Sequence, residues 1–339
     1  MTRFQKLILF LLITINTVNH SIVYGQEEKS KCPCLQSKIR FDDSSIEKLV
    51  LHPEDVLADP NLFWANDSAY RLVKLWHQEI SLPIPMDKWK GWVQELKNRS
   101  AEEREKNTQL IAVKSMIKKE KEFNDKAIPY ICSFLPKDCP TISTTIYFTT
   151  AIMASGFQMG NDIVIYGENA DKDNLLIHEL FHQGQRAYQP TSHENESKDS
   201  AMDQFYINLL IEGTATYVAY NALKEFPNVD PLIRNDYRLL QDANALNRLR
   251  EKLNEILKKA PSLVAAEAGR KEFMASLWQV GSTDRAFYVV GWYMAKIIDE
   301  KLGRDALAGA IPKGPRSFLH TYNSLVDEKL RVFDLYTKK

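Results

Sequence analysis

The sequence has no excess of either charge, because 44 lysines and arginines balance 44 aspartates and glutamates. Proteins that bind nucleic acid or an anionic membrane electrostatically carry a basic surface, and this balance provides no sign of one. The charged stretches at 97–106 and 117–122 mix both signs at helical spacing, which is typical of solvated helix faces. Composition therefore predicts neither a nucleic-acid-binding protein nor one that binds membranes by charge.

Long apolar runs are also lacking after the first residues of the chain. Residues 1–25 have the order of a secretion signal, with a basic start at Arg3 and Lys6, an apolar run at 7–15 and small residues before a cleavage at Gln26. The apolar run is shorter than the roughly 20 residues that span a bilayer as a helix. The sequence therefore predicts an exported protein, periplasmic or extracellular after cleavage, with no transmembrane segment.

Cysteine is scarce, with four residues in two closely spaced pairs. Neither spacing suits a four-cysteine zinc site, and in an exported chain we expect oxidised pairs. Cys132 and Cys139 could close the loop between them, whereas a disulfide between Cys32 and Cys34 would be strained. Cross-pairing between the two pairs is one alternative, and two free thiols near the N-terminal end are another.

What the sequence does contain is a five-residue motif rich in metal chemistry, His178-Glu179-Leu180-Phe181-His182. Residues four apart lie on one face of a helix, so His178 and His182 can send two imidazoles to one tetrahedral ion. Glu179 then lies beside the open position of that ion, where its carboxylate can accept a proton from activated water. The motif predicts a zinc-dependent hydrolase with Glu179 as general base.

The local context of the motif fits this interpretation. Two β-branched runs, at 142–149 and 162–166, predict strands that precede the motif. A helix is expected from about 174 to 188, with Asp171 and Asp173 as candidates for its N-cap. A strand that leads into a buried, histidine-bearing helix is the arrangement that the zinc site requires.

A third protein ligand is still needed. The position six residues after the second histidine holds Tyr188, so no third histidine is supplied there. A second helix, expected from about 200 to 223, contains Glu212 in an apolar stretch, where an unpaired buried carboxylate would cost several kcal/mol. Gly213 and Ala215 keep the surface of this helix shallow, which predicts its close approach to the histidine helix. Glu212 is therefore the predicted third ligand.

Two segments together resemble a known group of metallopeptidases. HELFH at 178–182 is followed, after 29 residues, by EGTAxY at 212–217, and the pair resembles the gluzincin zinc peptidases, in particular the bacterial peptidase-MA-like families. That resemblance implies a zincin-like core. It also implies one zinc ion and the roles of four residues: ligands His178, His182 and Glu212, and general base and acid Glu179.

The resemblance extends to Tyr288-Val289-Val290-Gly291, since related families carry a tyrosine and a glycine at this spacing beyond a helical insertion. Tyr288 could donate a hydrogen bond to the oxyanion that develops on a scissile carbonyl, and such a bond is strong in a low-dielectric cleft. A structural tyrosine is the alternative. Tyr293 and Tyr217 are further candidates for the same role.

The sequence departs from the related families at one position that matters for the site. Better-studied members place an aspartate four residues after the ligand glutamate, where it orients a histidine. Thr216 occupies that position in this sequence, and it could hydrogen-bond a ligand or back-bond to its own helix. By analogy with a strand that borders the cleft in such enzymes, part of 150–160 is expected to line the site.

The fold predicted from these patterns is α+β and predominantly helical. A helical N-terminal lobe is expected at 26–130, with the aromatic residues between 64 and 96 as its core rather than as a ligand groove. The zincin-like metallopeptidase core would follow at 131–339, with a small sheet and a helical insertion near 229–278. A third helix is expected from about 284 to Leu302, ended by glycine.

The sequence as a whole predicts a secreted or periplasmic zinc metallopeptidase that acts on peptide or protein substrates. Two imidazoles and one carboxylate favour zinc over other metals. One alternative is a zinc-dependent hydrolase of a non-peptide amide or ester, such as a cell-wall component. Another is a non-catalytic envelope protein that contains zinc. The presence of Glu179 argues against the latter, since structural zinc sites have four protein ligands and need no base.

Overall fold

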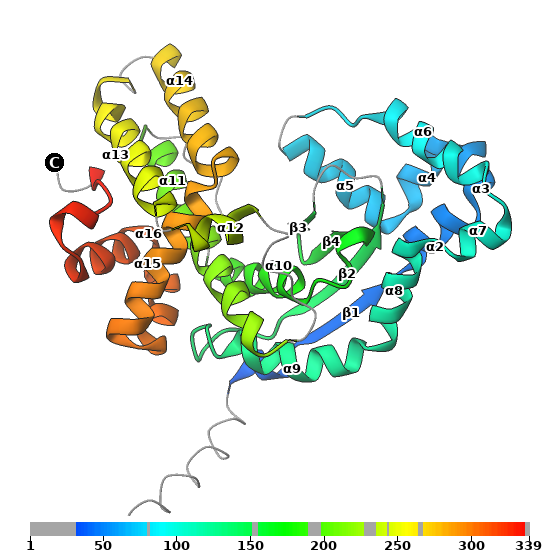
Figure 1. The fold of residues 1–339 in the computed structure, drawn as a ribbon, viewed down its shortest axis with the longest axis horizontal. Coiled ribbons are helices and arrows are strands. Elements are labelled where there is room, and N and C mark those ends of the chain that lie inside the picture. The colour runs from blue at the N-terminus through cyan, green and yellow to red at the C-terminus, as the bar shows by residue number, and fades with distance from the viewer. Residues whose placement is uncertain are drawn as a thin grey trace, which may run out of the picture.

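Helices dominate the fold, and they surround one small four-stranded sheet in the part of the chain that the structure describes (Figure 1). This arrangement confirms the α+β, predominantly helical prediction. The predicted signal segment at 1–25 lies outside the described residues. The computed structural model describes residues 32–79, 82–150, 155–188, 198–226, 235–242, 244–263 and 267–335.

The sheet has the strand order β1-β2-β4-β3. The two predicted strands are present as β2 (Ser143–Thr149) and β4 (Asp162–Tyr166), which pair in parallel. β3 (Gly156–Met159) pairs antiparallel with β4 and forms one edge. β1 (Lys38–Asp42) pairs in parallel with β2 and was not predicted, because it offers only two alternating apolar residues after a polar stretch.

A disulfide joins Cys34, just before β1, to Cys132 at the end of α9 (Glu120–Cys132). The loop pairing of Cys132 with Cys139 is therefore wrong, and cross-pairing between the two pairs is confirmed for one bond. Cys32 and Cys139 are free. Because the bond closes a loop with a sequence separation of 98, it is expected to contribute about 4 to 5 kcal/mol to stability.

The N-terminal helices share a second buried cluster, rich in aromatic side chains, with Phe157 and Val164 of the sheet. Trp89 donates to the hydroxyl of Tyr70 at 2.9 Å, and this hydroxyl donates to the carbonyl of Thr150 at 2.6 Å. Trp64 packs edge-on against both rings, so these aromatics form a core as predicted. The helices are α2 (Ser44–Leu51), α3 (Pro53–Ala58), α4 (Pro60–Asn66), α5 (Ser68–Glu79), α6 (Met86–Lys97), α7 (Ala101–Glu105) and α8 (Thr108–Lys118).

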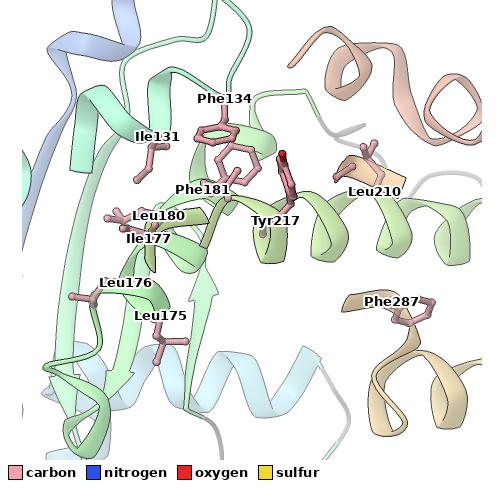
Figure 2. Close-up of a cluster of buried hydrophobic side chains, with 14 of the residues drawn as sticks. Ile131, Phe134, Leu175, Leu176, Ile177, Leu180, Phe181, Leu210, Tyr217 and Phe287 are labelled. Carbon is pink, nitrogen blue, oxygen red and sulfur yellow. The ribbon is translucent and has the colours of Figure 1, made fainter. Parts of the chain in front are cut away.

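The histidine-bearing helix α10 (Asp173–Arg186) lies at the centre of the molecule, between the sheet and the C-terminal helices (Figure 1). All its residues from Asp173 to Gln185 are buried. Its N-cap is Lys172, so the predicted caps Asp171 and Asp173 are wrong. The apolar residues of α10, from Leu175 to Phe181, belong to a buried cluster with residues of α9 and of the C-terminal helices (Figure 2).

The C-terminal part is helical, and the helices predicted near 200–223, 229–278 and 284–302 are present. The last of these ends at Gly303, whose φ of 87° suits glycine. In the described ranges, no helix is long and apolar enough to cross a membrane. The helices are α11 (Lys198–Asn221), α12 (Asn235–Gln241), α13 (Ala245–Leu263), α14 (Glu267–Trp278), α15 (Ala286–Leu302) and α16 (Arg304–Leu325).

Helices α11 and α15 cross with their backbones almost in contact. A methyl group added at Gly291 would lie 2.7 Å from Cα of Gly213, and closer still to the carbonyl oxygen of Leu209. The backbone nearest to Gly213 is therefore that of α15 and not, as was expected, that of the histidine helix, although α10 and α11 do pack against each other. Because Gly213 directly follows Glu212, one turn of α11 carries the metal-ligand candidate and fixes the position of α15.

Replacing Gly291 with alanine is expected to lower the free energy of unfolding by about 2 to 3 kcal/mol, since the two helices must separate to admit the methyl group. Gly309 in α16 is the matched control, because nothing lies within 4 Å of a methyl group added there. Its replacement by alanine should leave stability unchanged or raise it by up to about 1 kcal/mol. Denaturant unfolding measures the free energy of unfolding of both variants. Equal changes in that free energy would contradict the close crossing of α11 and α15.

Candidate metal centre

Three potential ligand atoms converge where α10 meets α11. Nε2 of His178 and Nε2 of His182 are 3.0 Å apart. Oε2 of Glu212 lies 3.3 Å from the first of these atoms and 3.7 Å from the second. The structure therefore brings together the three residues that the sequence indicated as ligands, and this group could hold a metal ion.

The spacing of these atoms fits a tetrahedral zinc ion. Zinc binds imidazole nitrogen at about 2.0–2.1 Å and carboxylate oxygen at about 2.0–2.2 Å, so tetrahedral ligand atoms lie about 3.3 Å apart. The three observed separations of 3.0, 3.3 and 3.7 Å bracket that value. Three protein ligands also leave the fourth position open, as in catalytic zinc sites.

The electrostatics of the cluster favour a positive charge at its centre. Burial would raise the pKa of the Glu212 carboxyl, but the imidazoles of His182 and His178 hold that pKa well below its usual range. Burial disfavours the charged form of His182, yet the Glu212 carboxylate raises its pKa to about 9. A cluster that binds a proton this strongly presents a suitable environment for a cation.

Gln185 fixes the orientation of His182. Its amide nitrogen donates to the carbonyl of Ile211 at 3.1 Å and to the hydroxyl of Thr214 at 2.6 Å. The amide oxygen is thereby directed to Nδ1 of His182, at 2.7 Å. Since this oxygen can only accept, Nδ1 must carry a proton, and once the ring is neutral its lone pair is on Nε2, the atom that faces the cluster. Gln185 follows the second histidine by three residues, a helical spacing that could have indicated this contact from the sequence.

Replacing Gln185 with leucine is expected to weaken zinc binding by about 10- to 100-fold, because His182 loses the acceptor that holds its tautomer and ring orientation. Gln183 is the control, since its amide donates to the carbonyl of Asp162 and not to a ligand. Competition with a zinc chelator measures the affinity of both leucine variants. Equal affinities would show that Gln185 does not orient the ligand.

Glu179 lies at the edge of the sheet. It is 7% exposed, and a Cβ added at Gly156 of β3 would be 3.6 Å from its Cγ. β3 is an edge strand, which offers backbone groups that an extended peptide can pair with. This position agrees with the expectation that part of 150–160 lies at the site, although residues 151–154 are outside the described ranges.

Of the tyrosine candidates, only Tyr288 lies at the cluster. Its ring is 6.3 Å from that of His178 and nearly parallel to it, at 19°. The hydroxyl of Tyr217 instead donates to Asp299 at 2.7 Å, and the ring of Tyr293 packs near α16. The contacts that the structure shows for these two tyrosines thus lie away from the cluster.

Thr216 makes neither of the hydrogen bonds considered for it. Its hydroxyl is buried and has no hydrogen-bond partner within the described part of the chain. Thr214, two residues earlier, back-bonds instead to the carbonyl of Leu210 and also contacts Gln185. Support for a ligand thus comes from the histidine helix itself, through Gln185, and not from the position where related families carry aspartate.

Arg285 is a residue near the site that the sequence did not indicate. Its guanidinium carbon lies 3.2 Å from the centroid of the Tyr288 ring. It precedes α15 as its N-cap and has a left-handed backbone, with φ 72° and ψ 22°. No sequence pattern marks such a residue, because arginine rarely adopts this conformation.

Comparison with known proteins gives one match. A family model matches residues 64–329, and the family is described as "Putative zinc dependent peptidase (DUF5700)". The matched range contains every ligand candidate, Glu179 and Tyr288. No curated protein and no solved structure matches the chain.

Proposed function

The chain belongs to this family, described as putative zinc dependent peptidases, and on this premise we propose that it hydrolyses peptide bonds. One zinc ion would be held by His178, His182 and Glu212. The observation that carries the proposal is the convergence of these three ligand atoms beside Glu179, with separations that fit tetrahedral zinc. An open fourth position and an adjacent carboxylate are what hydrolysis requires and what a structural zinc site lacks.

Zinc held by these ligands supplies Lewis-acid activation of water and of the scissile carbonyl. Glu179 accepts a proton from the attacking water as the water oxygen bonds to the carbonyl carbon. The carbon–nitrogen bond then breaks, and Glu179 delivers the proton to the leaving nitrogen. Its buried position beside β3 excludes bulk water from this transfer.

We assign to Tyr288 a hydrogen bond to the developing oxyanion. Support comes from its ring, which stacks beside the ligand His178 on the side that α15 covers. Donors that are held in place before the reaction stabilise such charge strongly in a low-dielectric site. The crossing at Gly213 and Gly291 sets the position of α15 and hence that of Tyr288.

Export of the mature protein is part of the same proposal. The disulfide between Cys34 and Cys132 supports it, because structural disulfides form and persist in oxidising compartments. The site would then act on peptides or proteins in the periplasm or outside the cell.

Digestion of a mixed peptide library by the zinc-loaded protein from Gln26 onward tests the proposed function. We expect cleavage that stops when a chelator removes the metal and returns when zinc is restored. Products identified by mass spectrometry would also give the sequence preference. A protein that binds zinc but cuts no peptide would contradict the proposal and favour a non-peptide amide or ester as substrate.

A further inference from the structure

The four cysteines gather where the segment before β1 meets the loop that follows α9. Cys34 is already bonded to Cys132, with a Cα–Cα distance of 5.8 Å. Cys139 belongs to the same buried cluster as these two residues, and the half-buried Cys32 packs against that cluster. Both free thiols therefore contact a cluster that already contains a disulfide.

The backbone holds the two free cysteines near each other. The hydroxyl of Thr141 donates to the carbonyl of Pro33 at 3.1 Å. Thr141 is two residues after Cys139, and Pro33 directly follows Cys32, so this hydrogen bond joins the two segments next to their thiols. Burial raises the pKa of the Cys139 thiol to about 11, and the Cys32 thiol contributes to that rise. Because this influence weakens with distance, the two thiols are neighbours.

The loop at 133–142, which carries Cys139, lies against the end of the histidine helix. Gly184 of α10 leaves no room for a methyl group, which would overlap the side chain of Leu135. The hydroxyl of Tyr188 donates to Asp138, the residue before Cys139, at 3.1 Å. A covalent bond at Cys139 would therefore hold a loop that supports the C-terminal turn of α10.

We propose that Cys32 and Cys139 form a second disulfide when the protein meets a disulfide oxidant, and that this bond holds the loop at 133–142 against α10. The exported protein then has no free thiol. This inference goes beyond the proposed peptidase activity and does not depend on it. It accounts for the positions of all four cysteines, since two bonds between the same two segments use each of them once.

The bond forms by two thiol–disulfide exchanges. Cys32 reacts first, because it is the more exposed of the two. Its thiolate attacks the S–S bond of an oxidant such as oxidised glutathione and releases one thiol. The sulfur of Cys139 then attacks the sulfur of Cys32 and releases the second thiol. The two protons of the protein thiols pass to the two released thiols, so the oxidant is reduced as the protein is oxidised.

Peptide mapping of the protein from Gln26 onward tests this proposal. The protein is equilibrated with oxidised and reduced glutathione, and the remaining thiols are blocked with N-ethylmaleimide under denaturing conditions before digestion. Trypsin leaves the first two cysteines on one peptide, 32–38, and separates the other two onto peptides 127–137 and 138–172. We expect one species of three joined peptides and no blocked cysteine. A species of two joined peptides, with Cys139 blocked on the third, would overturn the proposal.

Fragmentation of the joined species identifies the pairing. A break between Pro33 and Cys34 separates the first two cysteines, and the fragment with Cys32 is expected to retain peptide 138–172. If that fragment retained the peptide with Cys132, the pairing would be exchanged and the proposal would be wrong.

Thermal unfolding of Cys32→Ser measures what the bond holds. This change keeps the bond between Cys34 and Cys132, so the fold is expected to persist. The oxidised variant should unfold about 4 to 8 °C below the oxidised wild type. In excess reductant, which opens every disulfide, the two midpoints should coincide. Equal midpoints of the oxidised proteins would overturn the role of the bond in holding the loop. None of these measurements uses turnover, so their failure is distinct from a failure of the peptidase proposal.

Discussion

Replacing Glu179 with glutamine is expected to lower kcat/KM for peptide hydrolysis by about three orders of magnitude, while the protein still binds one zinc ion. General acid–base catalysis contributes about 10²- to 10⁴-fold, and glutamine keeps the size of the side chain but cannot accept the proton. None of the three ligand atoms belongs to Glu179, so zinc affinity should stay close to that of the wild type. Steady-state kinetics on a cleaved peptide, with metal analysis of the same samples, measures both quantities.

Glu168→Gln provides the control for this change. Glu168 lies in η3 (Gly167–Asn169), the turn that connects β4 to α10, and its carboxylate accepts from Gln109 on the exposed surface. Replacing this carboxylate with an amide should leave kcat/KM unchanged. If the Glu179 variant kept more than a tenth of the wild-type value, another residue would have to act as the base.

Replacing Glu212 with glutamine is expected to weaken zinc binding by about 10² to 10⁴-fold. The change keeps the shape of the side chain but removes the only negative charge among the three ligands. Loss of one partner from a buried charged cluster costs about 3 to 5 kcal/mol, and each 1.4 kcal/mol is about a factor of ten. Competition with a zinc chelator of known affinity measures the loss.

The matched control for Glu212 is Glu225→Gln, since Glu225 is an exposed residue just after η4 (Ala222–Lys224), which continues α11. This control should bind zinc as tightly as the wild type. Equal affinity for zinc in the Glu212 variant would show that the third ligand is a different residue. In that case Glu212 would only form an ion pair with the histidines and would not bind the metal.

The elements that hold the candidate site could be predicted because their signals are local. β4 is a short β-branched run, and α10 shows apolar residues and two histidines at helical spacing. Glu212 was identifiable because a lone carboxylate in an apolar helix needs a partner. Each of these inferences depends on residues a few positions apart.

The features that were missed depend on contacts between distant parts of the chain. The sequence led us to expect that Gly213 faces the histidine helix, but the backbone nearest to it is that of α15. Cross-pairing of the cysteines was one alternative, but local patterning could not single out Cys34 and Cys132, because it did not show β1, the strand that follows Cys34. Gln185 orients His182 only because the carbonyl of Ile211 on another helix directs its amide.

The arrangement gives α11 a central place in the site. Glu212 faces the histidines of α10, and the next residue, Gly213, allows α15 to approach. α15 in turn carries Tyr288 to the ring of His178, with Arg285 at its N-terminus. The metal-ligand candidate Glu212 and the proposed oxyanion donor Tyr288 are thus positioned by one helix crossing.

X-ray absorption spectroscopy at the zinc edge, on protein loaded with one equivalent of zinc, tests whether His178, His182 and Glu212 bind the metal. We expect a first shell of nitrogen and oxygen only, at about 2.0–2.1 Å, with outer-shell scattering from two imidazoles. Sulfur scattering at about 2.3 Å would contradict it, because the metal would then be bound by thiolates such as those of the free Cys32 and Cys139. A protein that retained no zinc would contradict it as well.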